Sequence, residues 1–273
     1  MKTILLPIEP YTGIEAAFAV AGLLADRFSG KVDCIALKPS IVDFIAPDPV
    51  VVVLPQTGYS DGDALKAARE RFDALSRVSF GGEGGRAFNW TGDAAIDDAG
   101  LASMSRLYDI TVVGRPGVGR NEPRMTTLEA VLFESGRPVM MAPVTPPKSL
   151  GKNILVHWNA STETARIIFD ALPLLKLAEK VTLLSVEGNK VAGPKPEEMV
   201  KYLMAHGVSA TVSQTRPVAK GGAGEAILAE GRRIGADLIL KGAYTQSRLR
   251  QMIFGGATQY ILQSADIPVL LSH

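Results

Sequence analysis

The chain has little cysteine and no excess of charge of either sign. Its single cysteine, Cys34, cannot form an internal disulfide bond, which fits a reducing compartment. Lys and Arg total 29 and Asp and Glu total 28, so the formal net charge is +1. Proteins that bind nucleic acid show a basic excess or a basic stripe. This composition therefore argues against nucleic acid as a main partner.

Long apolar runs are missing as well. No stretch reaches the roughly 18 apolar residues that a membrane-spanning helix requires. The first segment meets a charge at Glu9, too early for the apolar core of a signal peptide. Hydrophobic residues nevertheless make up 47% of the chain, enough for buried cores. We therefore expect a cytoplasmic protein with no membrane partner.

The common catalytic and metal-binding motifs do not occur. The sequence contains no G-x-x-x-x-G-K-[ST] loop, no G-x-G-x-x-G after a strand and no G-x-S-x-G elbow. It also lacks the S-G-G-x-D-S type of loop with which related α/β families adenylate their substrates. His157, His206 and His273 are far apart and share no metal-ligand spacing with acidic residues or Cys34. The sequence predicts neither an enzyme nor a metal site.

What the sequence does contain is an alternation of buried strands and amphipathic helices that occurs twice. Continuous apolar runs of the kind that a parallel sheet buries predict the strands, and apolar residues at helical spacing predict the helices. The first half is expected to have strands at 3–8, 31–37, 86–90, 110–113 and 138–142, with helices at 12–28, 63–78, 93–105 and 125–135. The second half is expected to have strands near 154–156, 181–186, 209–215, 238–240 and 268–271, with helices at 161–177, 196–205 and 224–234 and a last helix striped by Ile253, Ala257, Tyr260 and Ile261.

Matching landmarks make the repeat specific. Residues 109–114 correspond to 237–242, and residues 135–139 correspond to 264–269 with one residue inserted. Pro143, Pro146 and Pro147 mark a linker between the halves. We predict an α/β protein with two tandem doubly wound five-stranded parallel sheets, in domains 1–145 and 152–273. Ligands of such sheets bind beyond the carboxyl ends of the strands where strand order reverses, here the first and fourth strands.

At those strand ends the chain resembles the universal stress protein family. The resemblance is carried by residues 153–161, 242–245 and 254–258, and it covers nearly the whole chain as a tandem pair. It implies an adenine nucleotide alpha hydrolase-like fold. ATP-binding members have an Asp after the first strand that contacts adenine. After the fourth strand they have G-x-x-G, nine residues, and then Gly followed by Ser or Thr. The glycines let backbone N–H groups approach the phosphates at a helix N-terminus.

Carried over residue by residue, the resemblance assigns a nucleotide site to the second half. Asn159 takes the Asp position and Val186 the apolar contact with adenine. The three glycine positions fall on Gly242, Thr245 and Gly255. The Ser/Thr position falls on Gly256, and Thr258 matches a second hydroxyl of the same turn. The remaining expected pocket residues are His157, Trp158, Tyr244 and Ala257. The implied ligand is ATP or AMP.

The first half departs further from the family pattern. Glu9 occupies the Asp position, and Pro10 follows it. Gly114 and Gly117 retain G-x-x-G, but no glycine lies near Thr126 and Thr127, where the later one is expected. We therefore expect no nucleotide in this half. Even in the second half Asn159 lacks the carboxylate charge, so its side chain donates as well as accepts hydrogen bonds.

The sequence thus predicts a stress-response or signalling protein that acts through ligand occupancy or partner docking, without efficient catalysis. Its halves are expected to form an internal pseudo-dimer through strands 138–142 and 268–271, which covers edges that would otherwise invite aggregation. Whether two chains also form a homodimer stays open. One alternative is a nucleotide-free scaffold that acts through protein contacts. Another is a slow ATP hydrolase that uses Thr258 and the basic residues Arg248 and Arg250.

Overall fold

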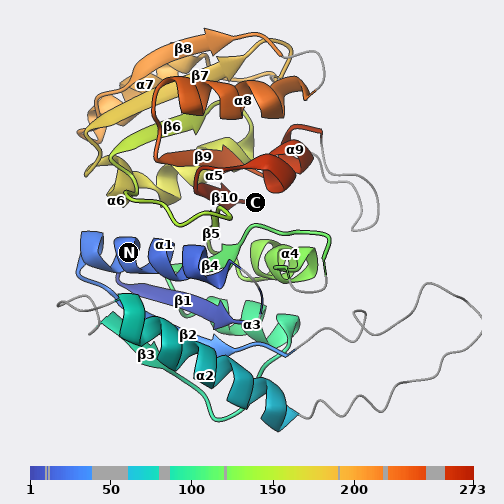
Figure 1. The fold of residues 1–273 in the computed structure, drawn as a ribbon. Helices are drawn as coiled ribbons and strands as arrows, with labels where there is room; N and C mark the ends of the chain where they lie inside the picture. The colour runs from blue at the N-terminus through green and yellow to red at the C-terminus, as the bar shows by residue number, and fades with distance from the viewer. Residues whose placement is uncertain are drawn as a thin grey trace, which may run out of the picture.

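The computed structural model describes residues 1–9, 11, 13–38, 61–79, 87–119, 122–189, 191–217, 221–243 and 256–273. Within them the chain forms an α/β fold whose elements alternate through most of its length (Figure 1). The strands are β1 (Thr3–Ile8), β2 (Lys31–Ala36), β3 (Phe88–Trp90), β4 (Ile110–Gly114), β5 (Val139–Ala142), β6 (Asn153–His157), β7 (Lys180–Val186), β8 (Thr211–Thr215), β9 (Leu238–Gly242) and β10 (Val269–Ser272). The helices are α1 (Ile14–Phe28), α2 (Asp61–Ser79), α3 (Asp98–Ser105), α4 (Met125–Glu134), α5 (Thr162–Asp170), α6 (Leu172–Leu175), α7 (Pro196–Ala205), α8 (Gly222–Arg233) and α9 (Gly256–Ser264).

The two halves meet in one continuous sheet. Its order is β3-β2-β1-β4-β5-β10-β9-β6-β7-β8, and all neighbours run parallel except β5 and β10. There Met140 faces Leu270 in an antiparallel pair, which confirms the predicted edge pairing. Two five-stranded parallel sheets were predicted. The pairing of β5 with β10 joins them, so that they are two parallel blocks of a single ten-stranded sheet. The reason is that each half ends on an edge strand whose backbone groups would otherwise lack partners.

The same contact anchors the first strand in each half. The backbone N–H of Thr3 donates to the Asp109 carboxylate at 3.1 Å, and the N–H of Asn153 donates to Asp237 at 2.9 Å. In return the Asp109 N–H donates to the Thr3 carbonyl at 3.0 Å, and the Asp237 N–H to the Asn153 carbonyl at 2.9 Å. The matched segments 109–114 and 237–242 therefore occupy equivalent places in the two halves.

Two apolar layers cover the sheet, and both continue through the two halves. One face packs against α1, α2, α5, α6 and α7, with side chains such as Phe18 and Ile168. The other packs against α3, α4, α8 and α9, and at its centre Val139 lies opposite Leu271 and Met141 opposite Val269. Cys34 is fully buried in the first layer, and burial raises the pKa of its thiol, so it is unreactive. Of the described helices, none is both long and apolar enough to cross a membrane.

Two predicted helices have different boundaries in the structure. The helix expected at 161–177 is divided into α5 and α6, because Pro173 has no N–H to donate to the preceding turn. Ser161 caps α5, and its hydroxyl accepts from the Thr164 N–H at 3.3 Å. The helix expected from Asp93 begins later, after Asp97 accepts from the Gly100 N–H at 2.8 Å. Ile253 of the predicted last stripe lies outside the described residues.

Candidate functional site

Strand order reverses once in each half, between β1 and β4 and between β6 and β9. At such a reversal the connections leave on opposite faces of the sheet, so the carboxyl ends of the two strands border a crevice. In the C-terminal half the strands end at His157 and Gly242, and in the N-terminal half at Ile8 and Gly114. Of the predicted site residues, His157 and Gly242 are the last residues of β6 and β9, and Trp158 and Asn159 follow β6 directly.

A buried lysine lies at the carboxyl end of β9. Lys241 is only 4% exposed. Its Nζ donates to the Gly242 carbonyl and to the Thr258 hydroxyl, both at 2.8 Å. Thr258 stands in the first turn of α9. Burial lowers the pKa of Lys241 to about 8, and the negative charge of Glu163 acts in the opposite direction. The ammonium is therefore retained at neutral pH between the strand end and the helix start.

His157 is the buried neighbour of this lysine. It is 1% exposed at the end of β6, and among the described residues neither ring nitrogen has a hydrogen-bond partner. Burial, with a smaller contribution from the Lys241 charge, lowers the pKa of His157 to about 3. The imidazole is therefore neutral at neutral pH, with one N–H donor and one acceptor that the chain does not use.

Asn159 follows β6 and holds the local turn. Its Oδ1 accepts from the Ser161 N–H and from the Thr164 hydroxyl, both at 3.1 Å. Its backbone carbonyl accepts from the Val191 N–H at 3.0 Å. Oδ1 is thus held by the Ser161 N–H and by the Thr164 hydroxyl, whose single proton it shares with the Ser161 carbonyl at 2.9 Å, and the amide NH2 is the group that can address a ligand.

The other described candidates have packing roles. Trp158 is 3% exposed, and its Nε1 donates to the Pro194 carbonyl at 3.1 Å, so the indole fills the core. Val186 is fully buried at the end of β7. A Cβ on Gly242 would lie 2.6 Å from backbone atoms of Glu163 and Thr164, so this glycine lets α5 approach β9.

Gly256 and Ala257 open α9 beside the buried lysine. Among the described residues, no atom lies within 4 Å of the position that a Cβ on Gly256 would take. The first N–H groups of a helix have no partner within the helix and carry its positive end. Tyr244, Thr245 and Gly255 lie outside the described residues, as do Arg248 and Arg250.

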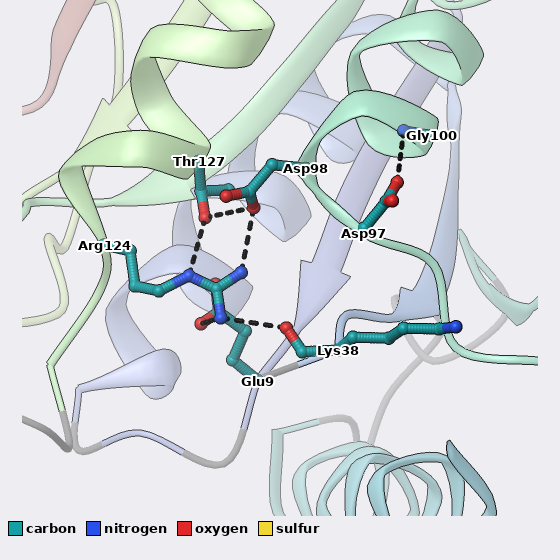
Figure 2. A network of polar contacts seen from close by, with 7 residues as sticks. All are labelled: Glu9, Lys38, Asp97, Asp98, Gly100, Arg124 and Thr127. Carbon is teal, nitrogen blue, oxygen red and sulfur yellow. Dashed lines mark hydrogen bonds and ion pairs between the residues drawn. The ribbon is translucent and has the colours of Figure 1, made fainter. Parts of the chain in front are cut away.

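In the N-terminal half an arginine, Arg124, lies at the end of β1 beside Glu9. Figure 2 shows the Arg124 guanidinium between α3, α4 and the end of β1. It donates to Asp98 Oδ1 and to the Lys38 carbonyl, both at 2.8 Å, and forms an ion pair with Glu9 at 3.7 Å. Thr127 donates to the same Asp98 oxygen at 2.8 Å. The side chains of Arg124 and Glu9 are only 11% and 10% exposed. This crevice is therefore closed by a cation of the chain itself.

The glycines of this half serve its own packing. A Cβ on Gly114 would lie 2.5 Å from Pro123 and 2.7 Å from the Tyr11 hydroxyl. Burial raises the pKa of Tyr11, and the Glu9 charge adds to the effect, so the phenol stays neutral. A Cβ on Gly117 would clash with Glu122 at 2.0 Å. The retained G-x-x-G pattern is thus needed for the fold of this turn.

Sheet register identifies which residues of the two halves are equivalent. Ile4 pairs with Ile110 in β1 and β4, and Ile154 pairs with Leu238 in β6 and β9. Counting onward from these pairs, the counterparts of His157, Asn159 and Lys241 are Pro7, Glu9 and Val113.

The helices that follow give one more equivalence. The Ser135 N–H bonds to the Val131 carbonyl at the end of α4, as the Ala265 N–H bonds to the Ile261 carbonyl at the end of α9. Leu128 is therefore the counterpart of Thr258. Pro7, Val113 and Leu128 are all buried and apolar, whereas His157, Lys241 and Thr258 are buried and polar.

Sequence reasoning did not single out Lys241 or Arg124. The signal for Lys241 was a charged residue directly after the apolar run 238–240 in a strand predicted to be buried. Arg124 gave no such signal, because its partners Glu9 and Asp98 are distant in sequence. Within the described ranges, His, Cys, Asp and Glu side chains form no group that could hold a metal ion.

The C-terminal half matches a known family. The model of the universal stress protein family matches residues 152–273. This half belongs to the universal stress protein family. The predicted family is thereby confirmed, whereas the predicted boundaries 1–145 and 152–273 of two domains stay a prediction.

Individual relatives agree with this assignment. The stress response protein NhaX of Bacillus subtilis (strain 168) is 37% identical over 54 residues, which span 20% of this chain and 32% of NhaX. A universal stress protein from Archaeoglobus fulgidus DSM 4304 has the same fold, with a TM-score of 0.71 at 17% identity, over 99% of this chain and 97% of that chain. A functionally unknown protein from Pseudomonas aeruginosa PAO1 gives a TM-score of 0.60 at 12% identity, over 100% and 92%. The universal stress protein fold thus extends over both halves.

Proposed function

We propose that the protein acts in a stress response by binding one adenine nucleotide, ATP or AMP, in its C-terminal half, without efficient turnover. The carrying observation is the contrast between equivalent crevices. Arg124 fills the one beside Glu9 with a cation that has charged partners, whereas in the described part of the other the Lys241 ammonium bonds to two neutral groups, the Gly242 carbonyl and the Thr258 hydroxyl in the first turn of α9. The family assignment of residues 152–273 and the name of the relative NhaX support the stress-related role.

The base would lie against Asn159 and the end of β7, with its phosphates towards α9. Because the Asn159 oxygen is already engaged by Ser161 and Thr164, the side chain offers adenine a donor and no free acceptor. The exocyclic amine of adenine is itself a donor. An Asn159→Asp variant would supply the missing acceptor while keeping the turn. One added hydrogen bond is worth about 1 kcal/mol, so nucleotide affinity should rise about fivefold.

Titration calorimetry with AMP, ADP and ATP tests the proposal on the full chain. We expect binding of one nucleotide per chain, tighter in Asn159→Asp. The matched change in the other half, Glu9→Gln, should leave binding unchanged. Absence of heat with all three nucleotides would favour the nucleotide-free scaffold. Phosphate release at a steady rate that depends on Thr258 would favour the slow hydrolase, and two nucleotides per chain would contradict a closed N-terminal crevice.

A further inference from the structure

The C-terminal crevice contains polar groups that the fold itself does not require. His157, Lys241 and Thr258 are 1%, 4% and 5% exposed. Their counterparts Pro7, Val113 and Leu128 are buried and apolar, and Val113 and Leu128 belong to the same apolar layer. Burying an ammonium is unfavourable unless it is paired. The N-terminal half therefore forms the same fold without polar side chains at these three positions.

The electrostatics of the crevice favour an anion. The Lys241 ammonium bonds to the first turn of α9, where the helix dipole is positive. The positive charge of the Lys241 ammonium and the positive end of the α9 dipole thus lie close together, and the Lys241 side chain is buried. Glu163 acts on Lys241 from the start of α5, but within the described structure the two form no direct ion pair. A negative group between the ammonium and the helix start would be stabilised by both.

His157 is a second, independent indication of a ligand. Neither of its buried ring nitrogens has a partner among the described residues. Leaving a buried polar group without a partner is destabilising by about 1–3 kcal/mol, so such groups are usually completed by a bound molecule. Because the ring is neutral beside an ammonium, its N–H can donate to an anion without adding to the positive charge.

We propose that Lys241 and His157, with the first turn of α9, recognise a phosphate group of the ligand. The two hydrogen bonds that Lys241 makes to Gly242 and Thr258 hold the ammonium in place, and its third N–H donates a hydrogen bond to a phosphate oxygen. This contact with a charged side chain adds to the backbone N–H contacts with phosphate that the glycine pattern implies. The inference rests on the proposed function only for the adenosine part of the ligand.

The test compares Lys241→Val, the residue of the sister position, with the wild-type full chain. Calorimetry is run with ATP, adenosine and inorganic pyrophosphate. Since a hydrogen bond to a charged group contributes about 1.5–3 kcal/mol, ATP affinity should fall about 10-fold to 100-fold, with adenosine affinity unchanged. The thermal midpoint should stay equal or rise, because an apolar group replaces a buried charge.

Two controls separate this site from general effects. Lys152→Ala removes an exposed charge of the same half and should change neither ATP nor pyrophosphate binding. Lys241→Met keeps the length of the side chain without the charge and should behave as Lys241→Val does, which excludes a shape effect of valine.

The outcomes distinguish the inference from the proposed function. Unchanged ATP affinity in Lys241→Val, or an equal loss for ATP and adenosine, overturns the phosphate role of Lys241. If the wild type binds neither ATP nor adenosine, the proposed function fails. The inference then still stands if pyrophosphate binds to the wild type and not to Lys241→Val, and it falls if pyrophosphate does not bind.

Discussion

The N-terminal crevice holds a cation that is matched inside the protein, whereas the C-terminal crevice holds one that is matched only in part. Arg124 forms ion pairs with Glu9 and Asp98 and donates a hydrogen bond to the Lys38 carbonyl, so two carboxylates match its charge. Lys241 is bonded to a carbonyl and a hydroxyl, neither of which carries a charge. The comparison teaches that one fold, used twice, can surround the cation at its strand reversal with carboxylates or leave it with neutral partners.

The largest effect is expected from breaking the sealed half. Arg124→Ala leaves two carboxylates with little exposure and no guanidinium between them. Removing one partner of a buried ion pair typically costs about 3–5 kcal/mol of the free energy of unfolding, and we expect a loss in this range.

Chemical denaturation of the full chain measures this loss. Arg69→Ala is the matched control, because Arg69 pairs with Asp73 on the surface, where both side chains are about half exposed. Such a surface pair contributes about 0.3–0.5 kcal/mol. Equal losses for Arg124→Ala and Arg69→Ala would show that the network does not close the crevice.

The next effect comes from moving the lysine into the sister half. Val113→Lys places an ammonium at a site that is 4% exposed, next to the apolar Leu128 in place of a hydroxyl. We expect this variant to lose about 3 kcal/mol or more, since a buried charge without a partner is strongly unfavourable. Chemical denaturation is again the measurement. A stable Val113→Lys variant would mean that this strand end tolerates a buried ammonium that has no partner. The buried Lys241 would then not distinguish the C-terminal half from the N-terminal half.

The smallest effect, counted for each pH unit, concerns the protonation of His157. The pKa of His157 falls from an ordinary value of 6.5 to about 3 in the folded chain, so between these values the unfolded state binds more protons. Stability is therefore lost as pH falls below 6.5, by up to about 1.4 kcal/mol per pH unit from this residue. His157→Leu should remove that part of the slope.

Denaturation curves between about pH 4 and pH 6.5, which lie within this linkage window, check the slope. Val186→Ala is the control: it creates a cavity in the same core and lowers stability at every pH without adding or removing a titrating group. An identical slope in wild type and His157→Leu would show that the imidazole titrates in the folded state as it does in the unfolded chain.

Much of the architecture was predictable because it rests on local patterns. Continuous apolar runs such as 4–6 and 154–156 predict buried parallel strands, and the matched segments 109–114 and 237–242 reveal the duplication. The boundaries were less certain. Asp93 and Asp97 are equally good helix caps by residue type, and only the backbone geometry selected Asp97. Pro173 is a residue type that interrupts helices, but apolar residues continue at helical spacing on both sides of it, so one uninterrupted helix was predicted.

The candidate site was predictable only in its location. Asn159, Gly242 and Thr258 follow from strand order and the family pattern, and the structure places them around the end of β6 and β9. Their partners did not follow from either. That Thr258 binds Lys241, or that Arg124 occupies the place beside Glu9, depends on helices packed against strands far away in sequence.

The sequence by itself determined that the chain is built from two α/β halves, that their last strands are edges, and where in each half the strand order reverses, because these properties depend on local hydrophobic pattern and on chain order. Only the tertiary structure decided that the edges join the halves into one sheet, and which crevice is sealed and which holds a buried, partly matched charge. Charge pairing depends on distances of a few ångströms between residues that the chain keeps far apart, and no local pattern encodes it.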